Sequence, residues 1–191
     1  PYTTLFRSGG VYRLGGFTLA TGLRYETSRM KGSWPDGSQD DFSRRFNDIV
    51  PSIRTTWRIN DQNSLKLAYT MRLSRPGISY LNPYHNETPI SVSYGNPHLG
   101  TTKANNFTLG YNLMTTKLTI GLNASLSLCD DAIAGVKWVE DNRFMSSYDN
   151  SGKVNYFQVV PYIQWQITPT TKLVSNSTVT WVDKANTSLG L

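Results

Sequence analysis

An alternation of apolar and polar residues with a period of two dominates residues 51–75 of this chain. On both sides of a polar break at 60–63, large apolar side chains recur at every second position, with Thr55 in place of one of them. Alternation over about ten residues on each side of a break predicts a β-hairpin. The apolar series comprises Ile53, Trp57, Ile59, Leu65, Leu67, Tyr69, Met71 and Leu73. Strands of this length match the roughly 9–11 residues that a tilted strand needs to cross a bilayer, so the segment predicts a transmembrane β-barrel hairpin.

The turn of this hairpin sets its predicted register. If Ile59 and Leu65 share a face, the loop is the three residues Asp61-Gln62-Asn63, with Asn63 in the left-handed conformation that such loops need. The same register places Arg58 opposite Lys66. Paired like charges are costly on a dry face and tolerable in a water-filled or plugged lumen. The charged face is therefore predicted to be the wet one.

The period of two recurs along the rest of the chain. Further strands are predicted at 17–26, 105–113, 118–128 and 157–167, with a partial strand at 11–14 and a last strand that begins at Lys172 and fades after Trp181. Short connections are expected at 15–16, 60–63, 114–117 and 168–171, and long polar loops at 27–45, 75–103 and 129–155. In the last loop we expect a weak strand at 133–139 and a turn at 150–152. Short turns at one end and long loops at the other are typical of outer-membrane barrels, whose long loops lie outside the cell.

These patterns predict an all-β fold, an antiparallel up-and-down transmembrane β-barrel fragment of about seven full strands that is open as it stands. The chain has no initiator Met and no signal peptide, so it is expected to be an internal part of a longer protein. Residues 1–8, PYTTLFRS, resemble a translated sequencing adapter and are expected to be an assembly artefact. Residues 9–191 form the predicted partial barrel.

The apolar face is expected to contact lipid. Trp57 and Trp165 each lie two residues before an Ile that precedes a short turn, and a Leu follows six residues after that Ile in both cases. A Trp at this position is where the aromatic girdle of a membrane barrel belongs. The alternative is a coincidental core Trp in a soluble sandwich. The predicted lipid-facing and girdle residues are Ile53, Trp57, Leu67, Tyr69, Leu109, Leu122, Ile163 and Trp165.

The composition argues against several other classes of function. The net charge is +6, but the basic residues alternate with apolar ones and form no basic helix or run, so no nucleic-acid partner is expected. The single Cys129 excludes an internal disulfide framework. His85 and His98 share a loop without a third ligand at suitable spacing, so no metal site or cofactor is expected. The sequence contains no nucleophile elbow, phosphate loop or paired catalytic carboxylates, and we expect no enzyme.

Two acidic pairs, Asp130-Asp131 and Glu140-Asp141, lie in the long loop 129–155. Carboxylates in an external loop could hold Ca²⁺. A solvated acidic loop is the preferred interpretation.

The long loop 75–103 contains the most distinctive motifs, RPGISYLNPY at residues 75–84 and YGNPHL at 94–99. Their Pro, Gly and Asn-Pro positions restrict the backbone, so a structured loop is predicted. The two motifs resemble those in the outer-membrane barrel region of TonB-dependent receptors, in the branch with R-R-x-x-R-P-x-x-x-x-L-N-P followed by G-N-P-x-L. The chain departs from this pattern at Leu73 and at 100–102, and the similar portion covers about 17–183. The matching residues are Arg72, Arg75, Pro76, Leu81, Asn82, Pro83, Gly95, Asn96, Pro97 and Leu99.

This resemblance implies a barrel of about 22 strands with an N-terminal plug domain, in the outer membrane of a Gram-negative bacterium. It further implies contact with outer-membrane lipid, energy supplied by an inner-membrane complex, and import of a ligand too large for porins. The ligand could be a metal chelate, a vitamin, a glycan or a peptide. The plug domain and the remaining strands are expected to lie outside this chain. The motif residues are structural in the family, so they imply no ligand contacts.

A stripe of basic residues on the polar face remains to be explained. It consists of Arg24, Arg54, Arg58, Lys66 and Arg72, and Glu26 is the acidic residue expected to oppose them. Such a stripe could line a path for an anionic ligand, pair with acidic groups of a plug domain, or simply be solvated. Pairing with a plug is the preferred interpretation, because a barrel of the family's size needs a blocked lumen.

Two other classes of protein would share much of this pattern. A small passive porin or adhesin barrel would need an even set of strands that closes near the observed ends. A secreted glycan-binding β-sandwich would bury its apolar faces against each other across a core.

Overall fold

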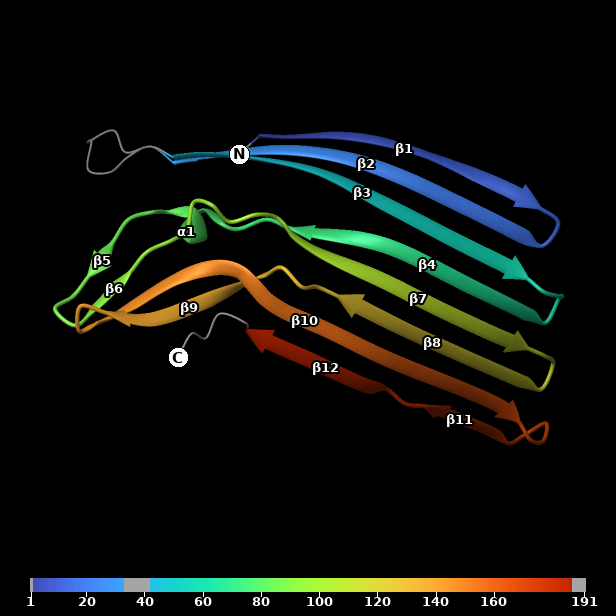
Figure 1. The fold of residues 1–191 in the computed structure, drawn as a ribbon. Helices are drawn as coiled ribbons and strands as arrows, with labels where there is room; N and C mark the ends of the chain where they lie inside the picture. The colour runs from blue at the N-terminus through green and yellow to red at the C-terminus, as the bar shows by residue number, and fades with distance from the viewer. Residues whose placement is uncertain (1, 33–41, 187–191) are drawn as a thin grey trace.

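The computed structural model describes residues 2–32 and 42–186 of the 191-residue chain. The described residues form one curved, mostly antiparallel sheet of twelve strands (Figure 1). Its wall consists of β1 (Tyr2–Leu14), β2 (Phe17–Gly32), β3 (Phe42–Arg58), β4 (Asn63–Ser74), β7 (Thr102–Met114), β8 (Leu118–Leu128), β10 (Arg143–Gln166), β11 (Lys172–Asn176) and β12 (Val179–Asn186). The end with the long connections also holds α1 (Ile78–Leu81), β5 (Asn86–Glu87), β6 (Ser91–Ser93) and β9 (Ala132–Glu140). No helix in the described part has the length and apolar character needed to span a membrane.

Strand pairing brings the predicted apolar positions together on one face of the sheet, which we call the apolar face. Ile53 of β3 pairs with Tyr69 of β4, and Leu67 of β4 pairs with Leu109 of β7. The side chains of Ile53 and Leu67 are each 47% exposed, because no described residue covers this face. By the same registers, this face also carries Trp57, Leu122, Ile163 and Trp165. The period of two in the sequence therefore becomes a two-faced sheet, as predicted.

The register of the β3–β4 hairpin differs from the prediction by two residues. Arg58 pairs with Ser64, and Lys66 pairs with Thr56. The predicted pairing of Arg58 with Lys66 is therefore wrong. A shift of two residues keeps every side chain on its predicted face, so the division into faces survives the correction.

The cause of this shift is the turn. Asn60 lies in it, and its Oδ1 accepts hydrogen bonds from the backbone N–H groups of Gln62 at 3.0 Å and Asn63 at 2.8 Å. The backbone N–H of Ile59 donates to the carbonyl oxygen of Asn63 at 2.9 Å, so the turn covers 59–62 and β4 begins at Asn63. Asn63 is not among the described residues with positive φ, so the predicted left-handed conformation is also wrong. The hydrogen bonds of the Asn60 side chain therefore stabilise a turn at 59–62 in place of the predicted three-residue loop at 61–63.

The long polar loop predicted at 27–45 is wrong over much of its length. β2 continues to Gly32 and β3 begins at Phe42, and these two residues pair with each other. Both strands therefore extend well past the stretch in which apolar residues alternate. Beyond the bilayer both faces of a strand can contact water, so pairing continues there without a period of two in the sequence. Residues 33–41 of the predicted loop lie outside the described residues.

The chain after β8 also departs from the prediction. β9 confirms the weak strand expected at 133–139, but β10 runs without a break through 150–152, where a turn was expected. The turn lies instead at Asp141 and Asn142, with φ of 47° and 63°. Positive φ at both central residues defines the tight turn that matches the twist of a hairpin, and Asp and Asn tolerate it. β9 continues the register of β8, so the two strands and β10 form one long hairpin.

The two ends of the described chain extend further than predicted. β1 pairs with β2 along its full length, from Tyr2 with Arg29 to Leu14 with Phe17. Any sequence can make backbone pairs of this kind, so the adapter origin of residues 1–8 stays a prediction. At the other end, the strand expected to fade after Trp181 continues to Asn186.

A small hydrophobic core lies where the loop between β4 and β7 folds against the sheet. Phe46 of β3, Leu81 of α1 and Leu99 are 5%, 0% and 1% exposed and pack together. Pro76 is also fully buried. Three residues of the two distinctive motifs therefore serve as packing groups, which is the structural role that the resemblance implies. The half-buried residues packed against this core are Met30, Phe42, Ile133 and Tyr148.

Candidate functional site

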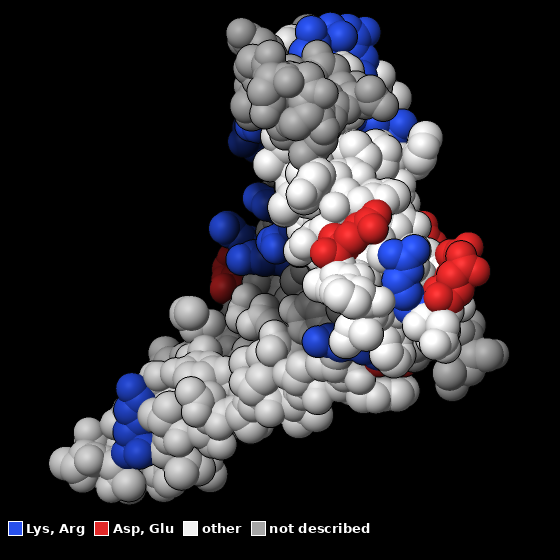
Figure 2. Space-filling view, turned by 90° about the vertical axis from the view of Figure 1, so that its left-hand side faces the viewer, with Lys and Arg blue, Asp and Glu red and all other residues white. Residues whose placement is uncertain are grey.

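The polar face of the sheet brings the five predicted basic residues together. Arg24 projects from β2, Arg54 and Arg58 from β3, and Lys66 and Arg72 from β4, all in positions that alternate with the apolar face. In the space-filling view, Lys and Arg side chains lie along the hollowed side of the molecule (Figure 2). The register puts uncharged residues beside the basic ones in the bilayer-spanning part: Arg54 lies between Ala20 and Ala68, and Lys66 between Thr56 and Gly110. Arg54, Arg58, Lys66 and Arg72 therefore have no like charge directly opposite them, whereas Arg24 pairs with Arg7 of β1.

An acidic residue that the sequence analysis missed lies on this face beside Glu26. Asp48 of β3 is paired with Glu26 of β2 and is only 4% exposed. Arg75 bridges the two carboxylates, with its Nη2 at 2.9 Å from Glu26 Oε2 and 3.1 Å from Asp48 Oδ2. Two adjacent carboxylates with little exposure to water would repel each other, so the Arg75 guanidinium is what makes their pairing tolerable.

Further groups complete this cluster. The hydroxyl of Thr101 donates to Asp48 Oδ2 at 3.1 Å, and Lys103 Nζ lies 3.9 Å from Asp48 Oδ1. Arg24 forms an ion pair with Glu26, so one member of the predicted basic stripe is neutralised within the chain. We call Glu26, Asp48, Arg75, Thr101 and Lys103 the anchor cluster, because it ties both ends of the loop between β4 and β7 to β2 and β3. Asp48 and Arg54 are six positions apart in one strand, so a period of two places them on the same face. This even spacing was the signal in the sequence that could have predicted Asp48 on the polar face.

The loop itself is rigidly built, as predicted. The backbone N–H of Gly95 donates to the carbonyl oxygen of Asn82 at 2.8 Å, and that of Asn96 donates to the carbonyl oxygen of Tyr80 at 2.7 Å. A Cβ at residue 95 would lie 2.5 Å from the Asn82 oxygen, so this close approach requires glycine. Asn96 Nδ2 donates to the carbonyl oxygen of Tyr148 at 2.9 Å. The two motifs thus bind each other and β10.

Contacts with β10 fix the loop from its other side. β6 pairs in parallel with the start of β10, with Ser91 beside Phe144. Asn150 Oδ1 accepts from the backbone N–H of Gly100 at 2.7 Å, and its Nδ2 donates to the carbonyl oxygen of Asp131 at 3.0 Å. Asn150 was expected in a turn, and instead it joins the loop to β10 and to the break between β8 and β9. The loop is therefore held between β3 and β10.

Several of the His and acidic residues considered as metal ligands contact other groups of the chain. His85 Nδ1 lies 3.9 Å from Glu87 Oε1, and both side chains are more than half exposed. Asp131 Oδ1 accepts a hydrogen bond from the backbone N–H of Lys103 at 3.0 Å. Glu140 Oε2 accepts one from Trp138 Nε1 at 3.1 Å. Across the described ranges, no three His, Cys, Asp or Glu side chains come together as a potential metal site.

A family model identifies the class of protein that this curved, two-faced sheet represents. The model of the outer membrane protein β-barrel family matches residues 10–189, so the chain belongs to that family. The predicted fold class and the predicted location in the outer membrane of a Gram-negative bacterium are confirmed. Curated protein sequences give no significant match.

Solved structures with the same fold include the FrpB iron transporter from Neisseria meningitidis (F5-1 variant), with a TM-score of 0.68 and 15% identity over 98% of this chain. The copper transporter OprC has a TM-score of 0.66 and 14% identity over 97% of this chain. The ferric yersiniabactin uptake receptor FyuA from Yersinia pestis has a TM-score of 0.61 and 15% identity over 97%. The chain spans 27%, 30% and 27% of these three proteins. At this identity the likeness establishes the fold, and it agrees with the resemblance to the barrel of TonB-dependent receptors.

Proposed function

We propose that the chain forms part of the barrel wall of an energised outer-membrane transporter that imports a large ligand. The observation that carries this proposal is the single curved sheet with one apolar face and one basic face, in a fold shared with proteins named as iron and copper transporters. A barrel wall needs this division, because one face contacts hydrocarbon and the other contacts water or a plug domain. A sandwich would cover its apolar face with a second sheet, and no described residue does so here.

The apolar face is proposed to contact lipid. Ile53, Trp57 and Leu67 are 47%, 48% and 47% exposed, and Ile163 and Trp165 are 42% and 47% exposed. Large side chains that remain half exposed on a well-paired sheet are stable only against another apolar phase. Trp57 and Trp165 lie close to the short turns, where an aromatic girdle would meet the lipid headgroups. The proposal keeps the eight positions named in the sequence prediction, and the registers given above support it by placing them on one face.

The basic face is proposed to pair with acidic groups of a plug domain supplied by the rest of the protein. Arg54, Arg58, Lys66 and Arg72 have no acidic partner among the described residues, whereas Arg24 pairs with Glu26. Four uncompensated cations on one wall generate a field that attracts an anionic surface. An imported anionic ligand would use the same field. The proposed role is transport and not catalysis, with energy from an inner-membrane complex outside this chain.

Charge reversal in the full-length protein tests this proposal. The double variant Arg58→Glu/Lys66→Glu removes two cations from the basic face, and Lys117→Glu/Lys172→Glu is its control, because both control residues are exposed beside the short turns. Permeability to small hydrophilic solutes is measured by swelling of proteoliposomes, and uptake is measured with ferric citrate as the anionic probe.

Each result has a distinct meaning. Raised permeability in the first variant alone supports pairing with a plug. Unchanged permeability with lost uptake supports a path for an anionic ligand. No change in either contradicts both roles and leaves a merely solvated face. High permeability of the unaltered protein would show a passive porin.

A further inference from the structure

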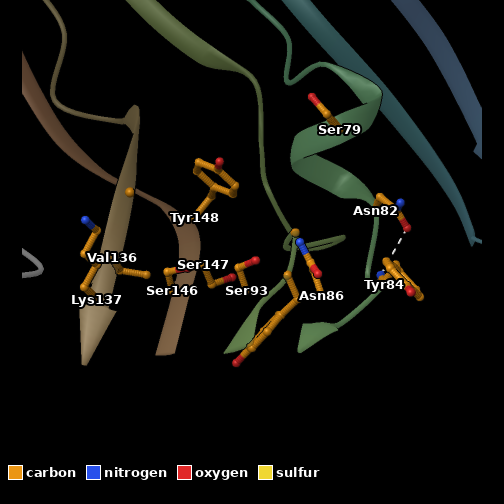
Figure 3. Close-up of a pocket in the computed structure, with 13 residues that line it drawn as sticks. Ser79, Asn82, Tyr84, Asn86, Ser93, Val136, Lys137, Ser146, Ser147 and Tyr148 are labelled. Carbon is orange, nitrogen blue, oxygen red and sulfur yellow. Dashed lines mark hydrogen bonds between the residues drawn. The ribbon is translucent and has the colours of Figure 1, made fainter. Parts of the chain in front are cut away.

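The two faces of the sheet carry different groups at the end with the long connections. On the polar face, Ser93 pairs with Ser146, and both line a pocket of about 320 Å³ together with Ser79, Asn82 and Asn86 (Figure 3). Lys137 is the one charged residue among the described residues that line this pocket. The outward face of β2 and β3, which continues the apolar face towards this end, is cationic instead.

Three exposed basic residues lie together on this outward face. Arg29 of β2 is paired directly with Arg45 of β3, and Lys31, two residues further along β2, is paired with Ser43. Arg45 is eight positions from Ile53 in the same strand, so a period of two places it on the face that carries Ile53. We call Arg29, Lys31 and Arg45 the outer basic cluster. Like charges directly opposite each other destabilise a sheet, so the Arg29–Arg45 pair needs a compensating anion.

The outer basic cluster has no acidic partner among the described residues. Two other exposed cations at this end of the sheet are compensated: Arg143 Nη1 lies 3.6 Å from Glu87 Oε2, and Lys153 Nζ lies 3.8 Å from Asp183 Oδ2. Figure 2 shows the same division, with Lys and Arg side chains at the top, where β2 and β3 end, and acidic side chains lower down. The uncompensated positive charge on the outward face is therefore concentrated on β2 and β3.

Below the cluster, the outward face changes from cationic to polar and then to apolar. The next pair holds Thr27 and Asn47, and Asn47 Oδ1 accepts hydrogen bonds from the hydroxyls of Thr27 at 2.8 Å and Tyr25 at 3.3 Å. The pair below consists of Tyr25 and Ile49, which are 43% and 60% exposed. A Tyr with an exposed ring and a hydroxyl bonded to a polar group is typical of a membrane–water interface.

The height of the cluster above the short turns matches the thickness of the hydrocarbon layer. Arg45 lies twelve positions before Trp57, which is close to a short turn. A strand rises about 3.3 Å per residue, so at a tilt of about 45° these residues span a height of about 28 Å. The apolar band of an outer-membrane barrel is about 25 Å tall. With Trp57 at one boundary of the membrane, the cluster lies among the lipid headgroups at the other.

We infer that the outer basic cluster binds the phosphate groups of an outer-membrane lipid. This inference goes beyond transport and rests on the proposed contact of the apolar face with lipid. Arg29 Nε donates to the hydroxyl oxygen of Ser43 at 3.1 Å, which orients the guanidinium and leaves its Nη1 and Nη2 for an anion. Guanidinium groups bind phosphate oxygens in a two-pronged arrangement. Paired residues lie about 5 Å apart and successive residues on one face about 7 Å apart, so the three cations can contact one phosphate.

Binding of diphosphoryl lipid A to the full-length protein in detergent, followed by native mass spectrometry, tests this inference. Arg29→Gln/Arg45→Gln should weaken the binding about tenfold or more, because each substitution removes charged hydrogen bonds to phosphate. The control Arg143→Gln/Lys153→Gln removes the same number of positive charges from this end of the sheet. It should weaken the binding less than about threefold, because these two cations already have acidic partners. Phosphatidylcholine and inorganic phosphate are the comparison probes.

A second measurement separates a bound phosphate from a change in folding. In liposomes of phosphatidylcholine alone, Arg29→Gln/Arg45→Gln should leave the urea midpoint unchanged or raise it, because the variant removes a repulsion. In the same liposomes with added lipid A, the variant should have a lower midpoint than the unaltered protein. The control variant should show no such reversal.

Three results would overturn the inference. The first is equal binding of lipid A in the two double variants, and the second is binding of inorganic phosphate as tight as that of lipid A. The third is a lower midpoint of Arg29→Gln/Arg45→Gln in phosphatidylcholine alone, which would show that the chain itself compensates the pair, for example with the acidic residues of 33–41.

The proposed transport function is judged separately. High permeability of the unaltered protein to small solutes, with lipid A binding that depends on Arg29 and Arg45, would refute energised transport alone. A closed barrel with equal lipid A binding in both double variants would refute this inference alone.

Discussion

Replacing Asp48 by Asn should loosen the loop between β4 and β7 without disturbing the barrel wall. Asp48 is 4% exposed and holds Arg75, itself only 16% exposed at its side chain, at 3.1 Å. An Asn side chain has the same shape as Asp and can still accept the hydrogen bond from the Thr101 hydroxyl. The substitution therefore removes only the negative charge. A hydrogen bond to a charged group contributes about 1.5–3 kcal/mol. Arg75 still has Glu26 as an ion-pair partner at 2.9 Å. We therefore expect the variant to destabilise the loop by about 2 kcal/mol, less than the roughly 3–5 kcal/mol that is lost when a buried charge keeps no partner.

The lower stability of the Asp48→Asn variant should appear as more frequent local opening of the loop between β4 and β7, because the anchor cluster ties this loop to β2 and β3. About 2 kcal/mol corresponds to about 30-fold faster amide exchange, since about 1.4 kcal/mol is a factor of ten. Hydrogen exchange of the Gly95 and Asn96 amides in the full-length protein measures it. The control Asp183→Asn removes an exposed ion pair with Lys153 at 3.8 Å and should change loop exchange less than about threefold. Equal exchange in Asp48→Asn and the unaltered protein would refute the anchoring role.

Three other changes have defined outcomes. Leu67→Arg should destabilise the barrel towards urea by roughly 2–4 kcal/mol and Thr70→Arg by much less; equal losses would contradict the assignment of faces. Gly95→Ala should loosen the loop by about 1–3 kcal/mol, because its Cβ would meet two backbone oxygens at 2.5 and 2.7 Å. Gly77→Ala meets nothing closer than 3.8 Å in the same loop, so its loop exchange rates should stay unchanged, and matching rates in the two variants would count against this explanation. Burial raises the pKa of the Cys129 thiol, so at pH 8 iodoacetamide should alkylate it about tenfold more slowly in the folded protein than in urea, and equal rates would contradict its burial.

The bilayer-spanning part of the wall could be predicted from the sequence because the membrane itself imposes the pattern. One face of each strand must be apolar and the other must not, so the alternation in β4, β8 and β10 locates strands and faces directly. The extensions of β2 and β3 carry no such constraint. Their pairing is made by the backbone, which leaves no period in the sequence.

Details that depend on individual side chains were harder to predict. The β3–β4 register is set by the hydrogen bonds that the Asn60 side chain accepts from the backbone of the turn. The length of the loop does not predict these hydrogen bonds. The anchor cluster joins Asp48 to Arg75 across 27 positions of sequence, and only the fold brings them together. The Asp141-Asn142 turn was visible in principle, because two adjacent residues that tolerate positive φ lie between two stretches able to pair. The motifs at 75–84 and 94–99, by contrast, correctly predicted a structured loop, because their Pro, Gly and Asn-Pro positions restrict the backbone locally.

The division of the wall into a lipid face and a lumen face is tested most directly by spin labels placed in turn at residues 53–58. The labels are attached to the full-length protein in liposomes, on a Cys129→Ser background that removes the chain's single cysteine. Labels at 53, 55 and 57 should collide mainly with dissolved oxygen in the bilayer, and labels at 54, 56 and 58 mainly with a water-soluble nickel complex. Equal access of the nickel complex to all six positions, or alternation in the opposite phase, would contradict the barrel wall described here.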